Sequence, residues 1–252
     1  MIRLVEKIFV TEIKLFTVFL VLILFLYGFT TPLLTAPLGV KLGFTASAFN
    51  YTDREMDPYT TFDIDLRPYL GYDIEWVQLG NQKPLFAPFV SCYVDVKIAD
   101  RYFCRPEISI TQKGVNFSQF DYERILYKVK ITYLQVPLLL GYQVVSKDHY
   151  QVDLYFGGSG ALKLNASKTV GYHQSDDQKF KIENVRNFDV SFIFGFDLKW
   201  NLFGACFMFD TRAFLGLSDI FSPIEHQSQL YHHTQKTKNA GFMFSLGYEF
   251  EL

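Results

Sequence analysis

The stretch Phe188-Asp-Val-Ser-Phe-Ile-Phe-Gly-Phe-Asp-Leu-Lys-Trp-Asn-Leu202 alternates between two kinds of side chain. Large apolar residues occupy every second position from Phe188 to Leu202, eight in all, and the positions between them are mostly small or charged. A repeat of two is typical of a β-strand with two different faces. Strands of soluble sheets usually have about five or six residues, whereas a tilted strand that crosses a bilayer needs about 9–11. The length of this stretch therefore favours a membrane-spanning strand.

The same alternation recurs along the chain, most clearly in the last strand, where Phe242, Leu246 and Phe250 share one face. Within residues 129–145, Pro137 lies inside the pattern, and Val129 and Ile131 are out of phase. We therefore expect a β-bulge there. The predicted strands lie near residues 38–50, 87–98, 102–113, 129–145, 150–165, 188–202, 204–219 and 240–252.

The connections between these strands alternate between short and long. The short ones lie near residues 99–101, 146–149 and 203, and the long ones span roughly 51–86, 114–128, 166–187 and 220–239. Short periplasmic turns and longer external loops are typical of outer-membrane barrels. We predict an all-β fold, an antiparallel transmembrane up-and-down β-barrel of about eight strands, with both termini on the periplasmic side. Residues 59–79 could add two strands, so ten strands remain an alternative.

The composition excludes several classes of protein. The formal net charge is -2 and no basic block is present, which argues against nucleic-acid binding. The mean hydropathy of +0.09 excludes a multi-helix membrane protein, but it permits a barrel, whose strands are polar on one face. Cys92, Cys104 and Cys206 form no CxxC motif and are odd in number, so we expect no disulfide, metal or redox site.

The first residues have the order of a signal peptide. Arg3, Lys7 and Lys14 precede the apolar run 15–27, and a more mixed stretch leads to Ala36. We therefore predict a signal peptide over residues 1–36 and a barrel domain over 37–252. Ala36 is the natural cleavage position, although Pro37 should hinder the peptidase. An uncleaved membrane anchor is the alternative.

The polar face of the strands is expected to line the barrel interior. This face is rich in Gly and Ser, which suits a narrow barrel crowded at its axis, and it carries charges of both signs. The alternatives are a soluble lipocalin-like barrel with an apolar ligand cavity, and a thin water column around solvated charges. Because an unpaired buried charge is costly, we predict an internal charge network. Its predicted members are Asp95, Lys97, Arg105, Glu107, Asp197, Lys199, Asp210, Arg212, Glu249 and Glu251.

Two motifs carry a family resemblance. The run Tyr102-Phe-Cys-Arg-Pro-Glu-Ile-Ser-Ile-Thr-Gln-Lys-Gly114, followed by Ile131-Thr-Tyr-Leu-Gln-Val-Pro-Leu-Leu-Leu-Gly-Tyr142, resembles the PorT-like outer-membrane barrel family. Its members tend to show a Pro-Glu-Leu strand ending in Lys-Gly, then Tyr-Leu-x-Ile-Pro-Leu-Leu. The chain departs at Ile108 and Val136, in its expanded first connection and in ending on Leu252. The resemblance covers residues 39–252 and implies the fold and an outer-membrane location. A link of some relatives to secretion does not pass to this chain by similarity alone.

The sequence offers no catalytic constellation. All five histidines fall in predicted turns or loops, and no acid is placed to orient the nearby Ser228 and His232. We predict no enzymatic activity, no cofactor and no metal site, whereas the long loops are the natural place for binding. We expect a closed, monomeric barrel in contact with outer-membrane lipids, serving as an envelope component or displaying loops to a protein partner. A small porin-like channel is the alternative.

Overall fold

The computed structural model describes residues 36–51, 82–118, 126–147, 149–172, 175–182, 184–202, 205–221 and 237–250. These residues form strands and turns, and no helix among them is long and apolar enough to cross a membrane. The strands are β1 (Leu38–Tyr51), β2 (Gln82–Val94), β3 (Val96–Ala99), β4 (Tyr102–Ser118), β5 (Leu126–Ser146), β6 (Tyr150–Tyr172), β7 (Ser175–Lys181), β8 (Phe188–Leu202), β9 (Ala205–Gly216) and β10 (Thr237–Phe250).

The strands close into an antiparallel barrel of eight, with two extra strands. β1 pairs with β10 on one side and with β2 on the other, and the pairing of β2 with β4 completes the ring. The first extra strand, β3, continues β2 along β4, and the second, β7, pairs with β6. The prediction of an eight-stranded barrel is confirmed. Residues 59–79, which we considered as two further strands, lie outside the described residues.

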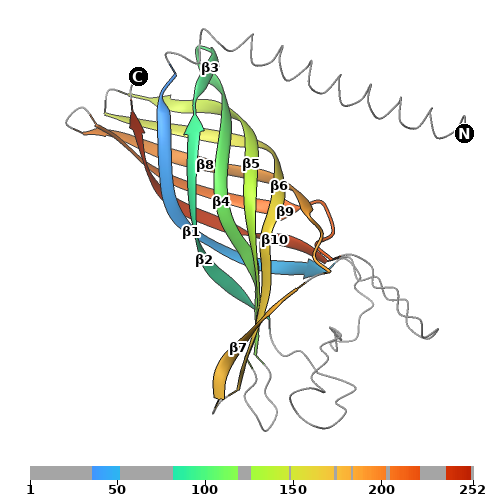
Figure 1. The fold of residues 1–252 in the computed structure, drawn as a ribbon. Coiled ribbons are helices and arrows are strands. Elements are labelled where there is room, and N and C mark those ends of the chain that lie inside the picture. Colours follow the sequence, from blue (N-terminus) through green and yellow to red (C-terminus); the bar gives the residue numbers. More distant parts are fainter. Residues whose placement is uncertain are drawn as a thin grey trace, which may run out of the picture.

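Short and long connections lie at opposite ends of the barrel. One end, here called the turn end, carries the short links β3–β4, β5–β6 and β8–β9, together with the start of β1 and the finish of β10. The opposite end, called the loop end, carries the longer connections. Figure 1 shows β3 at the turn end and β7 projecting beyond the barrel at the loop end. Several strands extend further than the alternation predicted, so that the connection after β4 shrinks to residues 119–125.

The two faces of the barrel wall differ sharply. Apolar side chains such as Leu42, Phe86 and Leu246 point outward and are 67%, 67% and 69% exposed. Charged and hydroxyl side chains point inward and are buried. This arrangement is the reverse of a lipocalin, in which the apolar face lines the cavity. The outer face therefore needs an apolar surrounding, as a bilayer provides.

The close packing inside depends on glycines at two points. A Cβ atom added to Gly141 would lie 2.0 Å from the Phe103 ring, and one added to Gly39 would lie 2.1 Å from Tyr93. Both pairs are neighbours across strands, as the partnering of Phe103 with Gly141 and of Tyr93 with Gly39 shows. An aromatic ring thus lies flat over each glycine and fills the interior of a narrow barrel.

The β-bulge predicted within residues 129–145 is present, although it does not lie at Pro137. The pairing of β5 with β4 and with β6 continues in register past Pro137. The register of β5 and β6 shifts between Thr132 and Tyr133, where Leu164 is the extra residue on β6, and again between Gln143 and Val145. Val129 and Ile131 were out of phase because they point inward with the polar residues, not because the strand is interrupted.

These inward apolar residues form a cluster at the loop end. Val115, Val129 and Ile131 are at most 1% exposed, and Val185 and Ile220 pack into the same group. Val185 also pairs with Phe221 in an isolated β-bridge, which joins the segments that precede β8 and follow β9. The full cluster comprises Phe49, Val115, Val129, Ile131, Tyr133, Ala161, Ala166, Val185 and Ile220. We call it the apolar plug.

Candidate functional site

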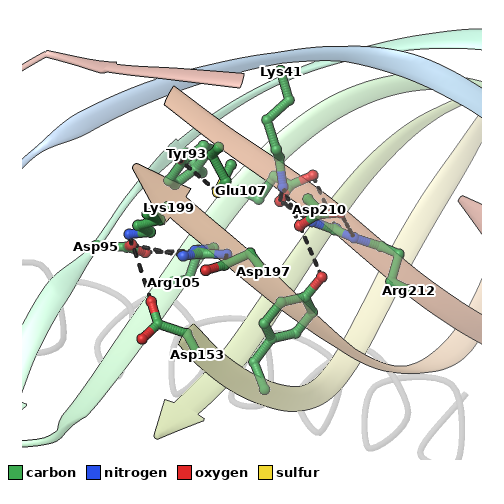
Figure 2. A network of polar contacts seen from close by, with 12 residues as sticks. Lys41, Tyr93, Asp95, Arg105, Glu107, Asp153, Asp197, Lys199, Asp210 and Arg212 are labelled. Atoms are coloured by element: carbon green, nitrogen blue, oxygen red, sulfur yellow. Dashed lines mark hydrogen bonds and ion pairs between the residues drawn. The ribbon is translucent and has the colours of Figure 1, made fainter. Parts of the chain in front are cut away.

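The barrel interior is the site where the chain concentrates its chemistry. Each strand places every second residue inside, so the charged positions of the alternating pattern converge on the barrel axis. Figure 2 shows the ion pairs that connect residues of different strands. Among the described residues, seven carboxylates and five cations are buried: Asp95, Glu107, Asp153, Asp189, Asp197, Asp210 and Glu249, with Lys41, Arg105, Lys113, Lys199 and Arg212.

The central cluster joins β1, β4 and β9. Glu107 accepts hydrogen bonds from Lys41 (Nζ to Oε2, 2.7 Å) and from Arg212 (Nη1 to Oε2, 3.2 Å). Arg212 also donates to both carboxylate oxygens of Asp210, at 3.0 and 2.7 Å. The Lys41 ammonium lies 3.4 Å from Asp210, so each cation contacts both carboxylates. Two positive and two negative groups therefore balance one another out of contact with water.

A second cluster surrounds Arg105 nearer the turn end. Its Nε and Nη2 donate to the two oxygens of Asp95 at 2.5 and 2.7 Å, a bidentate pair. Its Nη1 donates to Asp197 at 2.6 Å. The guanidinium thus bridges β8 and the short break between β2 and β3.

Lys199 extends this second cluster towards the turn end. Its ammonium lies 2.7 Å from Asp95, 2.5 Å from Glu249 and 3.7 Å from Asp153. Gln151 donates to both oxygens of Asp153, which has no closer cation than Lys199 among the described residues. The turn-end cluster therefore holds more carboxylates than cations, whereas the central cluster is balanced.

Two tyrosines connect the central and turn-end clusters. The ring of Tyr93 lies beneath both the Arg105 guanidinium, at 4.6 Å, and the Lys41 ammonium, at 4.8 Å. Tyr155 donates a hydrogen bond to Asp210 at 2.8 Å, and Arg105 lies 5.3 Å from its ring. Cations over aromatic faces gain further attraction where water is excluded. The clusters are therefore one continuous packed network.

A third ionic group lies between this network and the apolar plug. The Lys113 ammonium is 3.4 Å from Asp189, and it also lies 4.7 Å from the centre of the Phe214 ring. Asp189 accepts hydrogen bonds from Ser218 (2.7 Å) and Asn239 (3.1 Å). Along the barrel axis, polar groups therefore give way to the apolar plug at the loop end.

Most of the residues that the sequence assigned to the interior meet there. Eight lie buried and in contact with oppositely charged groups: Asp95, Arg105, Glu107, Asp197, Lys199, Asp210, Arg212 and Glu249. Glu251 lies outside the described residues. The network also includes residues absent from the prediction, namely Lys41, Tyr93, Lys113, Asp153, Tyr155 and Asp189. The period-two phase of their strands would have found them, since each shares the inward parity of its neighbours.

Lys97 is the exception among the predicted residues. It is exposed on β3 instead of buried in the network. Lys97 is paired with Phe103, whose ring faces inward, and it lines a pocket at the turn end, so it keeps the inward parity of Asp95. It is exposed because it lies at the mouth of the barrel, beyond the buried clusters. The alternation assigned Lys97 to the correct face but did not show where the buried interior ends.

A pocket of about 500 Å³ opens at the turn end. Lys199 and Glu249 of the turn-end cluster line it together with Cys206, and Ala36 and Pro37, just before β1, border it. The carbonyl of Pro37 accepts a hydrogen bond from the backbone of Asp95 at 3.2 Å, which holds this segment against the barrel. Water can therefore approach the network from the turn end.

The site contains no metal-ligand geometry within the described residues. No group of three or more His, Cys, Asp or Glu side chains there is arranged to hold an ion. Cys92, Cys104 and Cys206 are free thiols. Of the histidines only His149 is described, and it is exposed in a short turn. What the interior geometry supports is packing and charge compensation.

Comparison with known proteins agrees with this architecture. A family model described as outer membrane protein beta-barrel domain matches residues 34–222. No curated protein sequence matches the chain.

Three small surface barrels of known structure are similar in fold. OprG from Pseudomonas aeruginosa is 14% identical, with 86% of this chain and 97% of that chain covered and a TM-score of 0.43. The attachment invasion locus protein Ail of Yersinia pestis is 11% identical, with 85% and 99% covered and a TM-score of 0.38. Neisserial surface protein A is 8% identical, with 85% and 97% covered and a TM-score of 0.39. Such low identity concerns the fold alone.

Proposed function

Because the chain belongs to the outer membrane protein β-barrel domain family and lies in the outer membrane, we propose that it is a closed barrel that displays its loop-end connections outside the cell. In this proposal the barrel is a monomeric scaffold that conducts no solutes and carries out no reaction. The loops bind a protein partner. The resemblance to the PorT-like family is compatible with this role and belongs to the same proposal.

The observation that carries the proposal is the filled interior. A solute would have to pass the turn-end cluster, the central cluster, the Lys113–Asp189 pair and the apolar plug in turn. Lys41, Glu107 and Arg212 have almost no exposed side-chain surface. Breaking a buried pair by removing one partner costs about 3–5 kcal/mol, so thermal opening of several pairs together is rare.

Single-channel recording of the refolded full chain in a planar bilayer tests the closed barrel. We expect no conductance steps from protein whose folded state is verified by its heat-modifiable mobility in gels. A porin inserted under the same conditions serves as the positive control. Reproducible steps from the folded protein would contradict the proposal and favour a small solute channel. The 500 Å³ pocket at the turn end is the feature that supports this second candidate.

Two of the loop-end connections are anchored at their bases, so that each of these two can be removed separately. The Ile220 amide donates to the Thr237 carbonyl at 2.8 Å, which brings together the two sides of the connection between β9 and β10. The side-chain amide of Gln82 donates to the Phe49 carbonyl at 2.8 Å, near the ends of the connection between β1 and β2. The flanking residues belong to the barrel, because Ile220 is part of the apolar plug and Asn239 contacts Asp189.

Loop removal tests the binding part of the proposal. Residues 222–236 are replaced by two glycines, which is possible because Ile220 and Thr237 are already hydrogen-bonded. We expect the deletion variant to fold as a barrel. On intact cells it should no longer cross-link to the protein that cross-links to the wild-type chain. A variant lacking residues 52–81 is the matched control for a different loop. Identical cross-linked proteins in the wild type and both folded deletion variants would contradict loop-mediated binding.

A further inference from the structure

Four lysines form a compact array where β5, β6 and β7 extend beyond the barrel at the loop end (Figure 1). Lys130 and Lys181 are both paired with Ser167, one on each side of β6. Two residues further along each strand, Lys128 and Lys179 are both paired with Thr169. The two lysines that flank one residue of β6 are called a row. Residues paired across strands share a face of the sheet, so all four lysines lie on one face. We call them the lysine array.

The lysine array is on the lipid-facing side of the wall. Val129 and Ile131 point inward and are buried, so Lys128 and Lys130 point outward. On the same outer face of β5 the apolar surface includes Val136 and Leu138, and Leu162 of β6 pairs with Leu134. Lys130 lies four residues before Leu134 along the strand, towards the loop end, roughly 13 Å at about 3.3 Å per residue.

The height of the array places it at the lipid headgroups. Barrel strands tilt by about 35–45°, so roughly 13 Å along β5 corresponds to about 10 Å along the membrane normal. The polar region of each leaflet extends several ångströms beyond the hydrocarbon core. Lysine side chains near such an edge extend their ammonium groups to the headgroups. The array therefore faces the headgroup region of the outer leaflet.

The charge of the array is uncompensated within the described part of the chain. None of the ion pairs there involves Lys128, Lys130, Lys179 or Lys181. The ammonium groups of Lys128 and Lys179 both repel that of Lys130. Clustered like charges cost energy in the free protein, which a bound anion removes. The buried interior lysines, by contrast, all have carboxylate partners.

We infer that the lysine array binds the phosphate groups of phosphorylated glycolipid in the outer leaflet. Neighbouring strands lie about 4.8 Å apart, so the two lysines of a row straddle β6 with their Cα atoms about 10 Å apart. A phosphate between them receives charge-assisted hydrogen bonds from both sides. The two rows accommodate two phosphates on one glycolipid. This inference goes beyond the proposed scaffold role, since it concerns the barrel wall and not the loops.

The test measures binding of lipid A with two phosphates to the folded full chain in an uncharged detergent. Wild-type protein should bind it saturably, and the variant K128Q/K130Q/K179Q/K181Q should bind at least about tenfold more weakly, because each ammonium group near an anionic surface adds to the attraction. The control variant K83Q/K97Q/K147Q/K238Q changes the net charge equally at scattered positions and should bind as the wild type does.

Three outcomes would overturn the inference. These are equal binding by the array variant and the wild type, equal binding of lipid A stripped of phosphate, or binding of free pyrophosphate as tight as that of lipid A. The last outcome would assign the array to soluble phosphates. Should the fourfold variant misfold, K179Q/K181Q replaces it, because β7 pairs with β6 outside the closed ring. This double variant should still weaken binding severalfold, and unchanged binding would count against the inference.

Discussion

At the scale of the residue, the interior depends on matched pairs of charges taken out of water. Glu107 shows this best, because it is fully buried and contacts both Lys41 and Arg212. Moving an ion into the protein costs several kcal/mol, and only close partners recover that cost. The network is therefore weak support for overall stability but a strong constraint on individual positions. In the balanced central cluster, no member can be neutralised without leaving its partners uncompensated.

We expect Glu107→Gln to lower the free energy of unfolding by about 3 kcal/mol, because it leaves two buried cations facing Asp210 alone. Urea unfolding of protein inserted in lipid vesicles, followed by tryptophan fluorescence, measures the change. Asp100→Asn in the exposed turn before β4 is the control and should change the free energy by less than about 0.5 kcal/mol. A loss below about 1 kcal/mol for Glu107→Gln would indicate a hydrated interior around a water column.

At the scale of the element, the alternating pattern identified the barrel strands because one face meets lipid and the other meets the interior. The pattern was less clear where both faces are apolar, and it did not show where the buried interior ends. Val129 and Ile131 point into the apolar plug and so resembled an interruption, and Lys97 lies on the inward face but at the exposed mouth of the barrel. Contact partners were beyond prediction, since the pairing of Lys41 with Glu107 depends on strands 66 residues apart meeting across a closed ring.

Also at the scale of the element, β7 differs from the barrel strands in the number of strands it pairs with. β8 is hydrogen-bonded to β6 on one side and β9 on the other, whereas β7 pairs with β6 within the described residues. Hydrogen–deuterium exchange in nanodiscs should therefore show β7 amides exchanging at least about a hundredfold faster than those of β8, through local opening. Amides of β9 provide the internal reference. Equal protection of β7 and β8 would mean that β7 has a second partner strand.

At the scale of the whole molecule, the connection lengths predict the orientation, with the turn end towards the periplasm and the loop end outward. In a C92A/C104A/C206A background, a membrane-impermeant maleimide on intact cells should label Lys179→Cys in β7. Lys147→Cys, after β5 at the turn end, should be labelled only once the outer membrane is permeabilised. The background without an introduced cysteine is the control. The opposite labelling order would reverse the orientation and remove the basis for surface display.

The ion pairs that join distant strands across the barrel interior have a consequence for how the protein folds and inserts. Lys41 on the first strand is neutralised by Glu107 on β4 and by Asp210 on β9, so its partners arrive late in synthesis. A half-built sheet entering the bilayer would expose unpaired ions to hydrocarbon. Only the sealed cylinder hides them all. Insertion of an unclosed sheet is therefore expected to carry an energetic penalty, which closure of the seam between β1 and β10 removes.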